Sequence, residues 1–188
     1  MDPVADLHRR LARRGGAGPE RSRRAEGTTL PTGPKPGSRG KATVHKWWAD
    51  HGLSAHPAAV GKRIALALIE QRSTADKLAG ILVLHDQLGD QLRAADLASF
   101  ERLFDCGHLE DGAVCDAFGV QVLGTLLQRV RGRAEIARAL ATWRNAETPW
   151  QRRAACAAKS PAHSKSGRPA AFLRRPQLLH AICWFRRH

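Results

Sequence analysis

The chain has 188 residues, 43% of them hydrophobic, and its 31 Lys and Arg residues against 17 Asp and Glu give a formal net charge of +14. This length and apolar content suit a single globular domain. The charge favours an anionic partner, either DNA, RNA or an anionic membrane surface, unless a codon usage rich in Arg explains it alone. No apolar run approaches the roughly 20 residues that span a bilayer, and no apolar stretch follows the basic N-terminus as in a secretory signal, so we expect a soluble, cytoplasmic protein.

Residues 1–40 are predicted to be mostly disordered. Gly and Pro recur through this segment together with many Arg residues, and little apolar surface is present to offset the entropy lost on ordering. The exception is a short helix that we expect over residues 3–14. We therefore place the folded domain at residues 41–158.

Residues 41–158 carry the periodicity of helices. Gly52 is a natural stop for one helix, and Thr148 followed by Pro149 is a natural start for another. Apolar residues recur at three- and four-residue intervals, and the clearest stripe comprises Leu78, Ile81, Leu82, Leu84, Leu88 and Leu92. The pattern predicts helices over residues 41–52, 58–71, 73–89, 94–104, 111–130 and 133–145, with a further helix from Thr148.

No strand is predicted, because the valines lie on helical faces instead of alternating along the chain. Helices of about 10 to 18 residues that are joined by short loops are typical of stacked antiparallel pairs. We therefore predict an all-α fold of the HEAT-like α-solenoid type.

The sequence offers no motif for a metal ion or a cofactor. Its four cysteines are widely spaced and form no CxxC pair, so neither a disulfide framework nor a zinc site is expected. The histidines show no HxxxH or HExxH spacing, and no phosphate-cradling glycine motif or nucleophile elbow is present. We expect a protein that works without metal or cofactor.

Five side chains in the second half of the chain stand out. Asp116 is flanked by apolar residues, so it either has a function or forms an ion pair with an arginine of the next helix. Trp143 and Trp150 bracket a predicted turn, where they either fill the core or stack on deoxyribose or on a cationic base. Arg152 and Arg153 open a helix, a position that suits either a phosphate ligand or a carboxylate partner.

At these residues the chain resembles the DNA alkylation repair family, the glycosylases built from HEAT-like repeats. The resemblance covers residues 41–158, and no single motif carries it. The matching stretches are an opening motif at Gly27–Pro31, Trp47-Trp48 in the first helical pair, Asp76–Leu84 in the second repeat, Leu109–Leu127 in the helix of the catalytic carboxylate, and Trp143–Ala158 in the WxRR helix.

The resemblance implies a monomeric, nucleoid-associated enzyme that excises cationic N3- and N7-alkylated purines from duplex DNA. It implies a concave basic groove, no flipping of the base into a pocket, and no membrane association. Asp116 matches the catalytic aspartate and Arg153 the catalytic arginine, while Gly112 stands where the family has tryptophan. The residues expected to contact DNA are Arg152, Trp150, Trp143, Trp47 and Lys77.

The resemblance ends after Ala158, where the family would carry about two more helical pairs. Residues 159–188 instead have the composition of a polar linker followed by a basic segment, and from residue 172 we expect a helix that either lies against the last helical pair or forms an amphipathic tail. A truncated or frameshifted gene product is therefore one interpretation. Three other hypotheses stay open: a non-catalytic DNA-binding module, a scaffold for an acidic protein, and a degraded remnant of the family.

Overall fold

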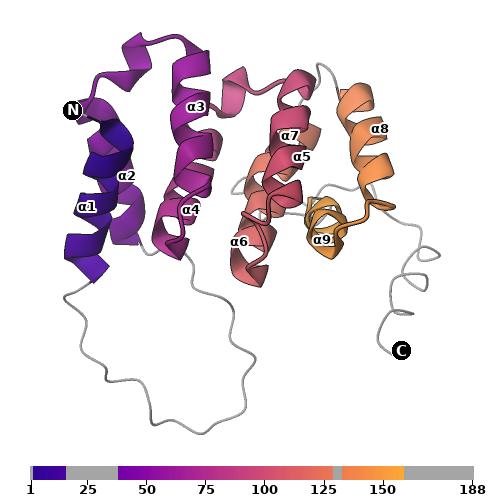
Figure 1. Ribbon diagram of the computed structural model, residues 1–188. Coiled ribbons are helices and arrows are strands. Elements are labelled where there is room, and N and C mark those ends of the chain that lie inside the picture. The colour runs from indigo at the N-terminus through magenta and orange to yellow at the C-terminus, as the bar shows by residue number, and fades with distance from the viewer. Residues whose placement is uncertain (1, 16–37, 129–132, 159–188) are drawn as a thin grey trace, which may run out of the picture.

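The computed structural model describes residues 2–15, 38–128 and 133–158. Within these ranges every regular element is helical, which confirms the all-α prediction (Figure 1). No helix in the described ranges is long and apolar enough to cross a bilayer. The segments predicted as disordered N-terminal chain beyond residue 15, and as linker and final helix after residue 158, lie outside the described residues.

The stack begins with α1 (Pro3–Gly15) and α2 (Ser38–Asp50), which lie side by side (Figure 1). The helix expected over residues 3–14 is therefore confirmed. It packs tightly, because Leu7 is fully buried in the core, and the indole N–H of Trp47 donates to the Pro3 carbonyl at 3.1 Å. Thus α1 is part of the helical stack.

The second pair consists of α3 (Ala58–Ile69) and α4 (Thr74–Leu82), which are in extensive contact with each other. Gly80 explains the close approach: a Cβ built there would lie 2.6 Å from the Ala65 carbonyl oxygen and 2.7 Å from the Ile69 side chain. The helix then continues as a π-helical segment, η2 (Val83–Gln87). The helix predicted over residues 73–89 thus has the expected extent but a wider final turn.

The third and fourth pairs complete the described stack. In the third pair, α5 (Leu97–Asp105) faces a long helix made of α6 (Gly112–Ala117), the π-helical segment η5 (Phe118–Leu123) and α7 (Gly124–Gln128). The fourth pair is α8 (Arg133–Trp143) and α9 (Pro149–Ala157). Short 3-10 turns occupy Leu53–Ala55, Gly89–Gln91 and Ala94–Asp96.

The second helices of the pairs form one continuous row. Helix α2 contacts α4, α4 contacts α6 and η5, and these contact α9. Aromatic side chains pack within and between the pairs. Phe104 on α5 packs edge-on against Phe118 of the same pair, at 5.9 Å between ring centroids, and against Trp143 of the fourth pair, at 5.7 Å. This stacking by pairs is the solenoid architecture that the sequence predicted.

Candidate nucleic-acid interface

Asp116 and Arg153 form a bidentate ion pair between neighbouring helices. Asp116 lies on α6 and Arg153 on α9. The Arg153 Nε donates to one carboxylate oxygen and Nη2 to the other, each at 2.7 Å. The two side chains are 46% and 50% exposed, so the pair lies at the surface and not in the core. This pairing raises the pKa of the Arg153 guanidinium above its ordinary value.

The ends of both helices are fixed by their own caps. Asp111 precedes α6, and its carboxylate accepts from the backbone N–H groups of Ala113 and Val114 at 2.9 and 3.0 Å. Thr148 precedes α9, and its hydroxyl accepts from the N–H of Gln151 at 3.3 Å. The predicted helix start at Thr148 is therefore confirmed, and Asp116 and Arg153 each lie in the first two turns of a capped helix.

Gly119 sets the distance between the two helices. A Cβ at this position would lie 2.7 Å from the Ala154 carbonyl oxygen and 2.8 Å from the Ala157 Cβ. No side chain larger than hydrogen fits there, so η5 and α9 approach more closely than any other residue type would allow. That close approach brings the Asp116 carboxylate within direct hydrogen-bonding distance of Arg153.

The surroundings of the pair are an indole and a glycine. The Arg153 guanidinium carbon lies 6.0 Å from the centre of the Trp150 ring, within the range of a cation–π contact. On another side it lies against Gly112, where a Cβ would meet the guanidinium at 3.6 to 3.7 Å. Gly112 is the position where the resemblance implies a tryptophan, and the Arg153 guanidinium lies next to it.

Cys115, next to Asp116, has a structural role. It is fully buried, and its thiol donates to the Trp150 carbonyl at 3.2 Å. Burial, assisted by the neighbouring negative charge of Asp116, raises the pKa of Cys115 to about 11. The thiol therefore stays protonated and packs as a small apolar group.

Arg152 and Lys77 are engaged by the protein's own carbonyl groups. Arg152 Nη1 donates to Ala146 and Glu147 at 2.6 and 2.8 Å, which closes the turn between α8 and α9. The Lys77 ammonium donates to the carbonyl of His108, in the loop before α6. Burial lowers the pKa of Lys77, and the nearby acidic residues of that loop oppose the shift. These hydrogen bonds occupy donors of both side chains, and their contact with DNA remains a prediction.

Trp47 and Trp143 do not take part in the surface that the sequence suggested. Trp47 is 0% exposed and Trp143 is 4% exposed. A ring enclosed in the core cannot stack on a nucleobase, so the expectation of DNA contact was wrong for both residues. Core packing, the alternative that the sequence left open for Trp143, is what the structure shows. Among the predicted tryptophans, Trp150 alone is partly exposed and beside the ion pair.

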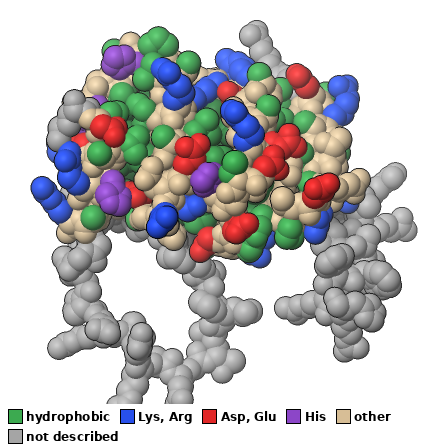
Figure 2. Space-filling model, viewed as in Figure 1, with side chains coloured by type: hydrophobic (Ala, Val, Ile, Leu, Met, Phe, Trp, Pro, Cys, Tyr) green, Lys and Arg blue, Asp and Glu red, His purple; other side chains and the backbone are tan. Residues whose placement is uncertain are grey.

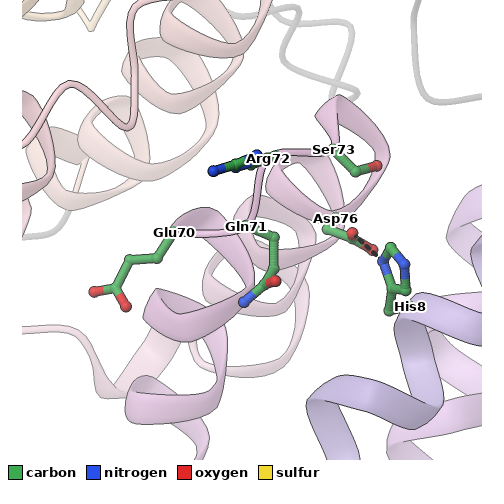
Figure 3. A pocket seen from close by; sticks show the side chains of 6 residues that line it. All are labelled: His8, Glu70, Gln71, Arg72, Ser73 and Asp76. Atoms are coloured by element: carbon green, nitrogen blue, oxygen red, sulfur yellow. Dashed lines mark hydrogen bonds and ion pairs between the residues drawn. The ribbon is translucent and has the colours of Figure 1, made fainter.

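Among the other carboxylates, the buried Asp76 and the half-buried Asp86 pair with histidines, and neither pairing was predicted from the sequence. Asp76 is fully buried and accepts from His8 Nδ1 at 2.5 Å across a hollow of about 600 Å³ at the turn between α3 and α4 (Figure 3). Asp86 accepts from Lys41, His45 and His85. Burial alone raises the pKa of Asp86, but these three hydrogen bonds outweigh it and lower the pKa to about 2. Within the described ranges, no group of three or more His, Cys, Asp or Glu side chains is arranged to hold a metal ion.

The charge is unevenly distributed along the chain. The described residues contain 18 of the 31 Lys and Arg residues and 15 of the 17 Asp and Glu, so they carry only +3 of the formal net charge of +14. The face drawn in Figure 2 accordingly shows basic and acidic side chains interspersed with hydrophobic ones. Most of the excess positive charge belongs to the segments at residues 16–37, 129–132 and 159–188.

A family model described as DNA alkylation repair enzyme matches residues 39–183. The match includes both helices of the Asp116–Arg153 site. It continues past Ala158, so the resemblance extends further than the quoted motifs indicated. No curated protein and no solved structure matches the chain.

Proposed function

Because the chain belongs to the DNA alkylation repair enzyme family, we propose that it is a DNA glycosylase. It hydrolyses the N-glycosidic bond of N3- or N7-alkylated purines in duplex DNA. A role in DNA repair follows from the family itself. The observation that supports the specific reaction is the exposed ion pair of Asp116 and Arg153.

Asp116 supplies the negative charge that this reaction requires. Alkylation puts a positive charge on the purine and weakens its bond to the sugar, which gains oxocarbenium character as the base departs. A fixed carboxylate beside that developing cation stabilises the transition state more than the ground state. Each Asp116 oxygen accepts one hydrogen bond from Arg153 and keeps further acceptor capacity toward solvent, where it can orient the attacking water.

Arg153 supplies the contact to the DNA backbone. Two of its N–H groups are used by Asp116, and the others are free to bind a phosphate oxygen, because half of the side chain is exposed. Without this arginine, Asp116 would repel the phosphates that flank the lesion. The guanidinium thus allows one carboxylate to approach a polyanion and keeps that carboxylate in a fixed orientation.

The experiment measures free 7-methylguanine after the protein is incubated with methylated duplex DNA. We expect release by the wild type, and a loss of about 100-fold or more in Asp116→Asn, the range typical for removal of one electrostatic group from an active site. Glu135→Gln is the matched control, because Glu135 is an exposed acidic residue on α8 outside the site. Equal release by Asp116→Asn and wild type would refute the assigned role.

A second function is favoured by Gly112. This glycine removes one aromatic wall from the site, and a protein that lacks that wall can bind DNA without releasing a base. Salt-sensitive binding of the duplex with no free 7-methylguanine would identify this function. In that case Gly112→Trp tests whether the missing aromatic wall explains the lack of base release, because a side chain at this position lies next to the Arg153 guanidinium.

A further inference from the structure

A small basic pocket is lined by residues of α1 and α2. These two helices lie at the opposite end of the described stack from α8 and α9 (Figure 1). It has a volume of about 200 Å³ and is lined by Arg10 and Arg13 from α1 and by Thr43 and Lys46 from α2. Three of these four residues carry a positive charge. Neither the proposed reaction nor the Asp116–Arg153 site uses any of them.

Two of the three cations are held in place by acidic neighbours. Arg10 donates from Nη1 to Asp50 at 2.7 Å and from Nε to Asp6 at 2.8 Å. Lys46 donates to the other Asp50 oxygen at 3.1 Å. These pairs orient the cationic groups across the gap between the helices. They lower the pKa of the Asp50 carboxyl and raise that of the Arg10 guanidinium.

The third cation, Arg13, is exposed and has no ion-pair partner among the described residues. The other cationic side chains near the pocket are Arg9, Arg10 and Lys46. The anionic ones are Asp6 and Asp50, and Asp6 also accepts a hydrogen bond from His51 at 3.0 Å. Among the described residues, four cationic side chains therefore lie around two carboxylates, so the pocket has an excess of positive charge. Since none of these residues forms an ion pair with Arg13, its hydrogen-bond donors are available to a ligand.

We propose that this pocket binds one phosphate group of a DNA backbone. The volume suits a single phosphate and excludes a base pair, and guanidinium and ammonium groups are the donors that phosphates prefer. The contact is independent of the lesion and of base release, because it reads only the backbone. It goes beyond the proposed function: it adds a second anchor, remote from the reacting sugar, that lengthens the stretch of duplex held by the stack.

A phosphate in this pocket also joins two helices. Arg13 belongs to α1 and Lys46 to α2, so one anion that accepts from both fixes α1 against its neighbour. We therefore expect undamaged duplex DNA to slow hydrogen exchange of the α1 backbone amides. The same measurement on Arg13→Gln should show less protection, because that variant removes the α1 cation that has no ion-pair partner among the described residues and leaves Arg10, which already pairs with Asp6 and Asp50, as the contact from α1.

The direct test measures binding of an undamaged, fluorescently labelled DNA duplex by the full chain over a series of salt concentrations. Each lost phosphate contact lowers the slope of log K against log salt by about one. We expect this decrease in Arg13→Gln and in Lys46→Gln, and no decrease in the control Arg138→Gln, which removes an exposed arginine of α8. The release of 7-methylguanine from saturating methylated DNA should be unchanged in all three variants.

Several results would overturn the proposal. An unchanged slope in both pocket variants means that no phosphate binds there, whether or not the protein releases bases. An equal decrease in Arg138→Gln means that the effect belongs to the overall charge. Saturable binding of inorganic phosphate at constant ionic strength, lost in Arg13→Gln while the duplex slope is unchanged, would assign the pocket to the free ion instead of DNA.

Discussion

Removing His8 tests how the first helix is held on the stack. Asp76 is 0% exposed, and His8 is its hydrogen-bonding partner across the hollow in Figure 3. Its second oxygen, Oδ1, has no partner in the described part of the chain. His8→Ala therefore leaves a buried carboxylate without the cation or hydrogen-bond donor that compensates its desolvation.

The cost of this change follows from the exposure of the two partners. Loss of one partner from a fully buried ion pair costs about 3 to 5 kcal/mol. Because the His8 side chain is 54% exposed, water can reach the vacated space, and the loss falls toward that of one charge-assisted hydrogen bond, about 2 kcal/mol. For a chain of this size that corresponds to a decrease in Tm of about 4 to 8 °C.

Thermal unfolding followed by circular dichroism measures the effect. Arg13→Ala changes a residue on the same helix that has no ion-pair partner among the described residues. It is the control and should leave the Tm nearly unchanged. The double variant His8→Ala with Asp76→Ala should be less destabilised than the sum of the two single variants, because it no longer buries an uncompensated charge. An unchanged Tm for His8→Ala, or simple additivity in the double variant, would refute the reasoning.

Three other predictions concern single residues. Gly119→Ala should destabilise the fold by about 1 to 3 kcal/mol and reduce base release, because the new methyl group overlaps the backbone of Ala154. Urea unfolding measures the first effect and the release assay the second. Wild-type values in both assays would contradict the close approach of η5 and α9. The pKa of Asp86 is lowered to about 2, so this carboxylate contributes stability above about pH 4 that is lost as the pH falls toward 2; Asp86→Asn should flatten this part of the stability–pH curve, and an unaltered curve would count against the pairing. Cys115 should react with a thiol reagent only after unfolding, whereas the exposed Cys106 reacts in the folded protein; mass spectrometry of the labelled peptides distinguishes the two, and prompt labelling of Cys115 would show that it is accessible.

The helices were predictable because their signals are local. The start of α9 follows from a threonine cap and a proline in the first turn, and the structure has both as expected. The two π-helical segments, η2 and η5, were not predictable. The apolar residues along α4 and along the long helix after Asp111 fit the period of an α-helix as well as that of a helix with one π-helical turn. A single wider turn changes the period too little to be visible in a short apolar pattern.

The candidate site was predictable only in part. Asp116 could be identified as either a functional carboxylate or an ion-pair partner, and the structure shows an exposed ion pair that is compatible with both. Periodicity could not distinguish Trp143 in the core from Trp150 beside the site, since both follow helical spacing. The pair of His8 and Asp76 spans 68 positions, and no local pattern announces a contact at that separation.

The central claim is that Asp116 and Arg153 act as one catalytic unit. The most direct test is a double-mutant cycle on the single-turnover rate of 7-methylguanine release, with Asp116→Asn, Arg153→Gln and the two changes combined, at DNA concentrations that saturate each variant. Groups that act as a unit are non-additive, so the combined variant should be about as slow as the slower single variant. Rate losses that multiply in the combined variant would show that the two residues act independently and would contradict the account.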